Sequence, residues 1–259
     1  MGDENQRTLK DFAHLFISQI TPKKVEKLQT RDPPKEPIKN TNGIAFFDSG
    51  EGWFKTFILS ELSILFSKWS YKIKIFEEGS LFPTVSWYLK NILYAHEIKE
   101  NIKIEKLFAF TNSALNKKNE LVFMEIPYFF PAKSKTFLSN TNLAVFSIPE
   151  DLPLRLRALH NLKRGLKLFK HIKYLVVLGE KPGTGKGREV FHNFVASNIE
   201  YENRLEFLGA VPKEPFIKNV SIPEGKPCLL NFSHSLTAEA LASIATNLRR
   251  ILEGTEAHI

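Results

Sequence analysis

Two lysine-containing stretches of the chain have the composition of phosphate-binding loops. The first is "GEKPGTGKGRE", residues 179–189, which follows the apolar run "YLVVL". Loops of the pattern G-x-x-x-x-G-K-[ST] surround a phosphate with backbone amides, neutralise it with the lysine and hold Mg²⁺ with the hydroxyl. In this stretch Glu180 stands at the first glycine position and Gly187 at the hydroxyl position. We therefore interpret it as a glycine-rich surface turn between a strand and a helix.

The second stretch, "DSGEGWFKT", follows the first apolar strand, where phosphate-binding loops usually lie. It retains Lys55 and Thr56, which could hold a phosphate and Mg²⁺. Ser49 and Phe54 stand at its two glycine positions, and a bulky side chain there obstructs the close approach of backbone to phosphate. Glu51 adds a negative charge to what should be a nest for an anion. This stretch thus lies where a phosphate-binding loop is expected, but it lacks glycine at the two positions that the pattern requires.

The elements that must position these residues alternate along the chain from Gly43 onward. Apolar patterns predict strands at 43–47, 71–76, 106–110, 120–126, 142–148, 174–178, 204–211 and 227–232. Helical patterns lie at 55–68, 84–94, 152–170, 187–197 and 235–253. Near-continuous apolar strands between helices indicate an α/β fold: a doubly wound, mostly parallel sheet, flanked by helices on both faces as in P-loop NTPases.

We divide the chain into an N-terminal helix with a flexible linker, residues 1–42, and one domain, residues 43–259. The apolar residues of "LKDFAHLFISQI" fall at helical spacing: Leu9, Phe12, Phe16 and Ile20. The following residues contain four prolines and many lysines, which is typical of an extended linker. The segment could dock on a partner or a membrane surface, or pack on its own domain, and its pattern leaves these alternatives open.

Taken in order, these stretches resemble the MinD/ParA-type ATPases of the SIMIBI class, and within them the FlhG/MinD branch, which includes the flagellar-number regulators. The phosphate loop K-G-G-x-G-K-[ST] of that family aligns with residues 50–56. The strand "KIKIFEEG" resembles "KVLLIDAD", and "ELVFMEIPYF" resembles "DYVIIDTPPG". The resemblance covers roughly residues 43–252, and its most specific part, "LEFLGAVPKEP", lies in the scaffold.

The resemblance implies a site for ATP or ADP and Mg²⁺ built from one glycine, one lysine, one hydroxyl and two carboxylates. The residues are Gly52, Lys55 and Thr56 for the nucleotide, Thr56 and Glu125 for the metal, and Glu77 and Glu125 as candidate catalytic groups. Gly50 replaces the lysine that reaches across the ATP-bound dimer, and Gly79 replaces a carboxylate that orients water. Because phosphoryl transfer depends on positioned charges, these losses predict that efficient hydrolysis is abolished.

Our leading hypothesis is therefore a degenerate (pseudo-)ATPase with a degenerate phosphate loop. It would act as a regulatory or spatial-positioning protein on a partner in polar, flagellar or cell-division machinery, with a homodimer as one expected assembly. The alternative is an active or slow Mg-ATP-dependent switch of the same family, based on the retained Lys55 and Thr56. A weaker alternative is a ParA-like nonspecific DNA binder.

The net charge of +8 favours acidic partners, and the expected helix 152–170 concentrates basic residues. A solvated lysine-rich surface explains this charge better, so nucleic acid is not the expected partner. The same helix places apolar residues at core-facing spacing: Leu152, Leu156, Leu159, Leu166 and Phe169.

The single cysteine, Cys228, and the polar N-terminal residues favour a cytoplasmic protein. A weak peripheral association with the inner face of the membrane remains an open alternative.

Overall fold

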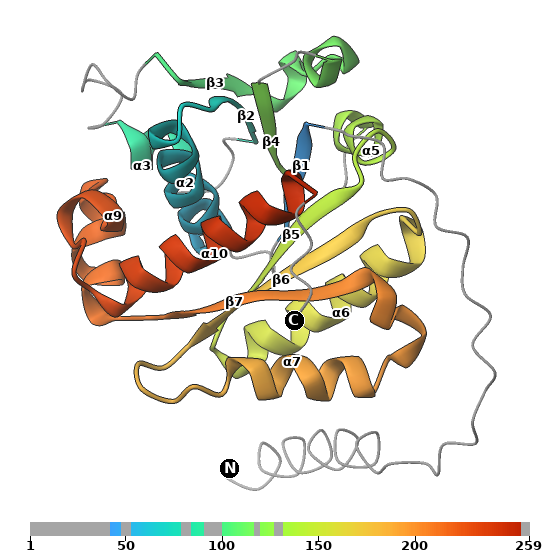
Figure 1. Ribbon diagram of the computed structural model, residues 1–259, viewed down its shortest axis with the longest axis vertical. Helices are drawn as coiled ribbons and strands as arrows, with labels where there is room; N and C mark the ends of the chain where they lie inside the picture. Colours follow the sequence, from blue (N-terminus) through green and yellow to red (C-terminus); the bar gives the residue numbers. More distant parts are fainter. Residues whose placement is uncertain are drawn as a thin grey trace, which may run out of the picture.

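The computed structural model describes residues 42–47, 53–78, 84–90, 100–116, 120–126 and 132–254. The N-terminal helix and linker expected before Asn42 lie outside the described residues. Seven parallel strands form one sheet in the order β3-β2-β4-β1-β5-β6-β7 (Figure 1). The strands are β1 (Gly43–Phe47), β2 (Lys72–Glu77), β3 (Ile102–Lys106), β4 (Glu120–Glu125), β5 (Leu143–Ile148), β6 (Lys173–Glu180) and β7 (Leu205–Pro212).

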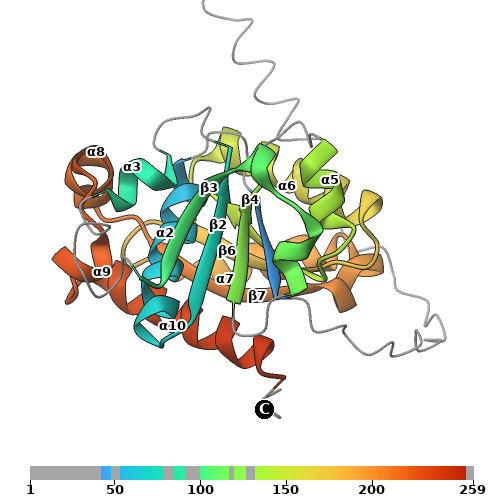
Figure 2. The same ribbon diagram turned by 90° about the horizontal axis from the view of Figure 1, so that it is seen from above.

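Helices cover both faces of the sheet (Figure 2). One face carries α2 (Trp53–Lys68), α3 (Val85–Leu89), the short π-helical turn η4 (Ile217–Ser221), α8 (Ile222–Glu224), α9 (Cys228–Asn231) and α10 (Leu236–Leu252). The other carries α5 (Ala132–Leu138), α6 (Leu152–Leu168) and α7 (Gly187–Ala196), with short 3-10 turns η1 (Leu107–Ala109), η2 (Asn112–Asn116) and η3 (Ile199–Arg204). The expected doubly wound α/β fold is confirmed. Within the described residues, none of the helices combines the length and apolar character that crossing a bilayer requires.

Two separate cores explain why the central strands are apolar at nearly every position. In β1, Ile44 and Phe46 enter the core beneath α2, whereas Ala45 and Phe47 enter the core on the opposite face. Successive side chains of a strand point to opposite faces, so a strand covered on both sides has no position for a solvated polar residue.

Two of the expected strands are wrong. The sequence at 106–110 ends β3 and continues as η1, because Phe110 turns inward and packs edge-to-face on Phe76, with ring centroids 5.3 Å apart. The sequence at 227–232 contains α9, whose first amides, of Cys228 and Leu229, donate to the buried carboxylate of Glu61. A short apolar run fits a strand or a buried helix equally well, and only the tertiary partner decides between them.

Helix α6 buries only part of the face that was expected: Leu166 is buried as predicted, whereas Leu152 is not. Its fully covered residues are Ala158, Asn161, Leu162, Gly165 and Leu166. Two of these are small, and a Cβ at Gly165 would lie 2.9 Å from the Tyr174 hydroxyl, so α6 approaches the sheet closely along this stripe. The expected core residue Leu152 is 58% exposed, whereas Leu156 and Leu159 are half-buried.

Candidate functional site

The carboxyl ends of β1 and β4 bring together three residues expected at a nucleotide site. Lys55 and Thr56 lie in the first turn of α2, which follows β1, and Glu125 ends the neighbouring strand β4. Phe46 pairs with Glu125 across the two strands, which places both carboxyl ends at the same level. The Thr56 hydroxyl donates to Glu125 Oε1 over 2.9 Å.

The lysine of this group is buried and engaged. Lys55 is 3% exposed; its Nζ lies 3.6 Å from Glu125 Oε1 and donates to the Ile126 carbonyl over 3.3 Å. The second carboxylate oxygen of Glu125 accepts from the Glu78 amide over 3.2 Å. A buried charge is tolerated when it is paired and hydrogen-bonded, and this cluster satisfies both conditions. A hydroxyl beside a carboxylate fits Mg²⁺, and an ammonium beside them fits a phosphate.

Glu77, the other candidate catalytic carboxylate, is held in a separate cluster at the end of β2. It is 1% exposed, and Lys106 of β3 donates to its Oε1 over 2.6 Å. Ser86 in α3 donates to the same carboxylate through its hydroxyl and, over 2.9 Å, through its amide. Burial alone would raise the pKa of Glu77, but the bonds from Lys106 and Ser86 outweigh it and lower the pKa. The carboxylate is thus ionised and fully engaged in structural contacts.

The N-terminal end of α2 carries an aromatic and cationic stack. Lys213, which follows β7, places its Nζ 4.9 Å from the ring centroids of both Trp53 and Phe54. Lys218 lies 5.6 Å from the Trp53 ring. Burial, and then the charge of Lys218, lower the pKa of Lys213 to about 8. A cavity of about 240 Å³ beside this stack is lined by Trp53, the β5–α6 turn and residues 213–218.

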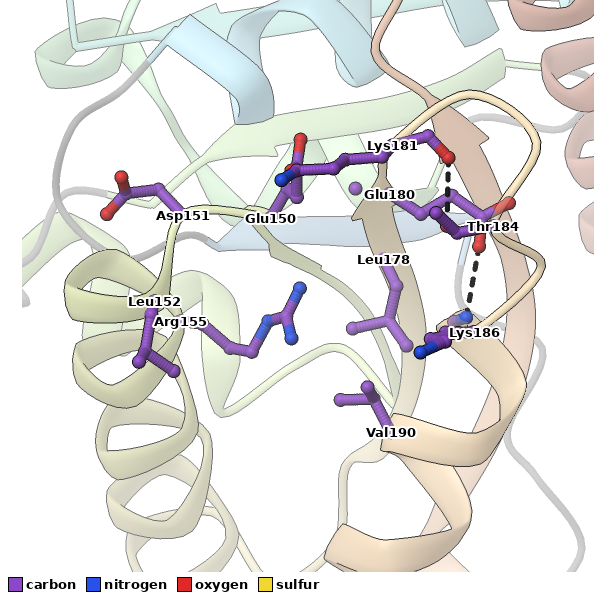
Figure 3. Close-up of a pocket in the computed structure, with 12 residues that line it drawn as sticks. Glu150, Asp151, Leu152, Arg155, Leu178, Glu180, Lys181, Thr184, Lys186 and Val190 are labelled. Atoms are coloured by element: carbon purple, nitrogen blue, oxygen red, sulfur yellow. Dashed lines mark hydrogen bonds and ion pairs between the residues drawn. The ribbon is translucent and has the colours of Figure 1, made fainter. Parts of the chain in front are cut away.

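The larger neighbouring cavity, of about 500 Å³, lies between the ends of β5 and β6 and the starts of α6 and α7 (Figure 3). The glycine-rich stretch 179–189 forms one wall, and the Arg155 side chain extends from α6 toward β6. Glu180 accepts from the Gly187 amide over 3.0 Å and so caps α7. Lys181 lies 3.9 Å from Glu150. The walls therefore carry acidic and basic groups together, and one pair of them, Lys181 and Glu150, lies within ion-pair distance.

These observations place most of the expected site residues. Lys55, Thr56 and Glu125 converge, whereas Glu77 belongs to the Lys106 cluster; Gly52 lies outside the described residues, as do Gly50 and Gly79. Sequence reasoning did not identify Lys106 or Lys213 as partners at this edge. Both lysines lie far in the sequence from the residues that they contact, so no local sequence pattern could have identified them. Among the described residues, the side chains of Lys55, Thr56 and Glu125 thus fit a phosphate and Mg²⁺, and we derive no hydrolytic step from them.

Structures of ATPases share this architecture. The MinD cell division protein of Aquifex aeolicus, also solved as a MinC:MinD complex, superposes with a TM-score of 0.61 at 13% identity, over 80% of this chain and 96% of that one. A ParA family ATPase from Chlorobium tepidum gives a TM-score of 0.57 at 11% identity, over 80% and 98%. The septum site-determining protein MinD from Pyrococcus horikoshii, in complex with Mg-ADP, gives 0.54 at 15%, over 84% and 99%.

No protein-family model matches the chain, and no curated protein matches it in sequence. The identities of 11–15% are too low to carry an activity from these structures to this chain. The chain therefore has the fold of the MinD and ParA ATPases, with a lysine, a threonine and a glutamate converging at the edge of the sheet where ligands of such folds bind.

Proposed function

We propose that this chain is a catalytically degenerate relative of the MinD/ParA ATPases, of the FlhG/MinD branch, that acts as a regulatory interaction protein. The observation that carries the proposal is the stack at the start of α2, where Lys213 lies against Trp53 and Phe54. In an active phosphate loop, glycines leave this region open to the ligand. Here the first two residues of α2 are aromatic, Phe54 is buried in the core, and the poorly solvated Lys213 lies against both rings.

The hydrogen bonds of Glu77 also support the proposal that the site is catalytically degenerate. A carboxylate that positions water must keep an oxygen available, but Glu77 accepts from Lys106 and twice from Ser86. Recruiting it would break a salt bridge in which the carboxylate is almost completely buried. Removing one partner of such a pair is costly because the other charge loses its compensation.

If the altered loop and the engaged Glu77 no longer support hydrolysis, binding a protein partner is the role that remains for this scaffold. Aquifex aeolicus MinD, which shares the fold, forms a complex with MinC. For this chain we propose a protein partner in flagellar, polar or division machinery, and a homodimer whose formation does not require nucleotide. Light scattering of the full chain with and without Mg-ATP tests whether the homodimer forms without nucleotide. A dimer that appears only with Mg-ATP would contradict the proposal.

The decisive experiment measures nucleotide turnover and binding by the full chain. We expect phosphate release in Mg-ATP to stay at the level of Lys55→Ala, which removes the buried ammonium. Lys68→Ala, at the exposed end of the same helix, is the matched control. Saturable turnover that Lys55→Ala abolishes and Lys68→Ala preserves would refute the proposal.

The second candidate is a slow Mg-ATP-dependent switch, favoured by the contact between Thr56 and Glu125 and by the adjacent Lys55. Thr56 and Glu125 would hold Mg²⁺, and Lys55 would neutralise a phosphate. Bound Mg²⁺ would supply charge neutralisation there. Titration calorimetry with Mg-ATP and Mg-ADP separates the two candidates, since the switch requires saturable binding that Thr56→Ala weakens. No heat of binding at millimolar nucleotide would eliminate the switch.

A further inference from the structure

A cavity of about 330 Å³ adjoins the start of α2, where Trp53 forms part of its wall. The first turns of α6, from Asp151 to Arg157, form a second part, and Lys213 and Lys218, which follow β7, form a third. The cavity thus gathers three cations, Arg157, Lys213 and Lys218, which we call the cation cluster. Arg157 and Lys218 are exposed, whereas Lys213 is half-buried. Among the described residues that line the cavity, Asp151 is the one that is acidic.

The carboxylates beside the cation cluster are bonded to other groups. Asp151 Oδ1 accepts from the Leu154 amide over 3.3 Å and so caps α6. Glu214 Oε2 accepts from the amide and the hydroxyl of Thr237, over 2.9 and 2.8 Å. Within the part of the chain that the structure describes, no carboxylate lies within ion-pair distance of any of the three cations. The cluster therefore carries positive charge that its own neighbours compensate only in part.

The electrostatics at Lys213 favour an anionic occupant. Burial lowers the pKa of Lys213, and the charges of Lys218 and Arg155 act in the same direction. Glu150 and Asp151 oppose these effects without cancelling them, so the pKa falls to about 8. A carboxylate among the three cations would stabilise the charged form of Lys213 and offset its repulsion with Lys218.

We propose that the cation cluster binds the side-chain carboxylate of a single glutamate or aspartate of the protein partner, between Arg157, Lys213 and Lys218. This inference rests on the proposed function, which gives the chain a protein partner. The planar guanidinium of arginine can donate two parallel hydrogen bonds to one carboxylate, and the two lysines add charge. Trp53 and Pro153 line the cavity beside these cations, and their apolar surfaces suit the methylene groups of the bound side chain.

The acidic groups around the cavity favour a carboxylate over a phosphate or a longer polyanion. Asp151 lies in the wall, and it repels a doubly charged phosphate more strongly than a singly charged carboxylate. Glu150 and Glu214 line the neighbouring cavity and limit the cationic area, whereas a nucleic-acid backbone is bound by cations along its length. Lys55 and Thr56, which fit a phosphate and Mg²⁺, do not line this cavity.

Heteronuclear NMR of the Trp53 indole N–H, assigned with Trp53→Phe, tests the proposal on the full chain. The probe is the acetylated and amidated tripeptide Gly-Glu-Gly, and the matched probe is Gly-Gln-Gly, both at constant ionic strength. We expect Gly-Glu-Gly to shift the Trp53 signal saturably and Gly-Gln-Gly to leave it unchanged. Arg157→Met and Lys218→Met should each weaken the binding by about tenfold, since each removes one charged donor. Lys167→Met, which removes an exposed charge of α6 outside the cavity, is the matched control and should bind like the wild type.

The pH dependence of binding supplies a second readout, because the peptide should bind the protonated form of Lys213. The affinity for Gly-Glu-Gly should be constant from about pH 6 to about pH 7 and fall as the pH rises through about 8. Lys213→Met should bind more weakly and lose this fall. The loss assigns the titration to Lys213 and not to the other charged groups that face it: Glu150, Asp151, Arg155, Arg157, Glu214 and Lys218.

Other results with these probes would overturn the proposal. A missing shift with Gly-Glu-Gly, or an equal shift with Gly-Gln-Gly, would show that the cavity does not select a carboxylate. Equal weakening by Lys167→Met would show diffuse attraction to a basic protein, and a fall above pH 8 that persists in Lys213→Met would remove Lys213 from the site. Inorganic phosphate or Mg-ATP that binds more tightly than Gly-Glu-Gly, and does so through Arg157 and Lys218, would assign the cavity to a phosphate.

Phosphate release measured on the same samples separates this inference from the proposed function. Turnover that depends on Lys55 would refute the degenerate ATPase. Failure of the peptide to bind, without such turnover, would overturn only the contact between the cation cluster and the partner.

Discussion

Replacing Glu61 with glutamine should remove a pH dependence of stability that the fold of this protein creates. Glu61 lies in the middle of α2 and is completely buried. Its Oε1 accepts from the Tyr88 hydroxyl and the Cys228 amide, each over 2.5 Å, and its Oε2 accepts from the Leu229 amide over 3.1 Å. Tyr88 also lies 2.8 Å from the Ser221 hydroxyl, so one carboxylate ties α2 to α3, α9 and the η4–α8 turn.

Burial raises the pKa of Glu61 from 4.5 to about 7, although the bonds from Tyr88, Cys228 and Leu229 and the charge of Lys68 oppose the shift. The folded protein therefore binds more protons than the unfolded chain between these two values. The contribution of Glu61 to stability is therefore fully present below pH 4.5 and is lost as the pH rises through about 7. A shift of this size corresponds to about 3 kcal/mol in the free energy of unfolding.

Urea unfolding at constant ionic strength, followed by circular dichroism from pH 5 to pH 8, measures this effect. The wild type should lose up to about 3 kcal/mol more than Glu61→Gln over this range. At pH 5 the variant should be the less stable protein, by about 1–3 kcal/mol, because the side-chain nitrogen of glutamine, in place of Oε2, cannot accept from the Leu229 amide. The two stabilities should therefore approach or cross as the pH rises.

Glu224→Gln is the matched control, since it removes a half-exposed surface carboxylate and keeps the Glu61 network intact. Its pH profile should follow that of the wild type. Parallel profiles for the wild type and Glu61→Gln would refute the reasoning, because they would mean that Glu61 gains no protons on folding. A wild-type stability that rises relative to Glu61→Gln above pH 6 would show that the hydrogen bonds outweigh burial.

Three further predictions concern other parts of the chain. Glu77→Gln should destabilise the protein at pH 7 by about 1–3 kcal/mol. Because the pKa of Glu77 is lowered in the folded protein, its contribution to stability is present above pH 4.5 and is lost as the pH falls below that value. Urea unfolding should therefore show a smaller loss of stability in acid for the variant than for the wild type. Gly209→Val should lower the melting temperature, at a cost of about 1–3 kcal/mol, because a Cβ there would lie 2.5 Å from Ile244 Cγ1; an unchanged melting temperature would contradict this packing. Trp53 fluorescence should titrate near pH 8 as Lys213 loses its proton, and Lys213→Met should abolish that transition, whereas a transition that persists in the variant would assign it to another group.

The parts of the fold that were predicted correctly are those with an unambiguous local pattern. β5 and β6 are long β-branched and apolar runs, and α10 begins after Ser235, which accepts from the Ala238 amide as a helix cap. α9 could not be assigned in this way, because the group that satisfies its first amides, Glu61, lies far away in the chain. Its signal was the glutamate itself, an acidic residue in the middle of a largely buried helix.

The candidate site shows the same division between local and long-range information. Lys55 and Thr56 were recognisable from one short stretch, and Glu125 from the resemblance of "ELVFMEIPYF" to "DYVIIDTPPG". Lys106 lies 29 residues from Glu77 in the sequence, and their ion pair depends on the register of β2 against β3. No pattern within either segment specifies that register, so the engagement of Glu77 could be learned only from the assembled sheet.

The glycines of "GEKPGTGKGRE" have packing and turn roles that require no phosphate. A Cβ at Gly179 would lie 2.6 Å from Lys213 Cε and 3.2 Å from the Glu150 amide, so this glycine lets the stem of Lys213 pass toward Trp53. A Cβ at Gly187 would lie 2.7 Å from that of Ala210, which brings α7 close to β7. Gly183 and Gly185 have φ values of 77° and 60°, which other residues rarely adopt. The stretch that looks most like a phosphate loop thus helps to hold a lysine against the altered loop at the start of α2.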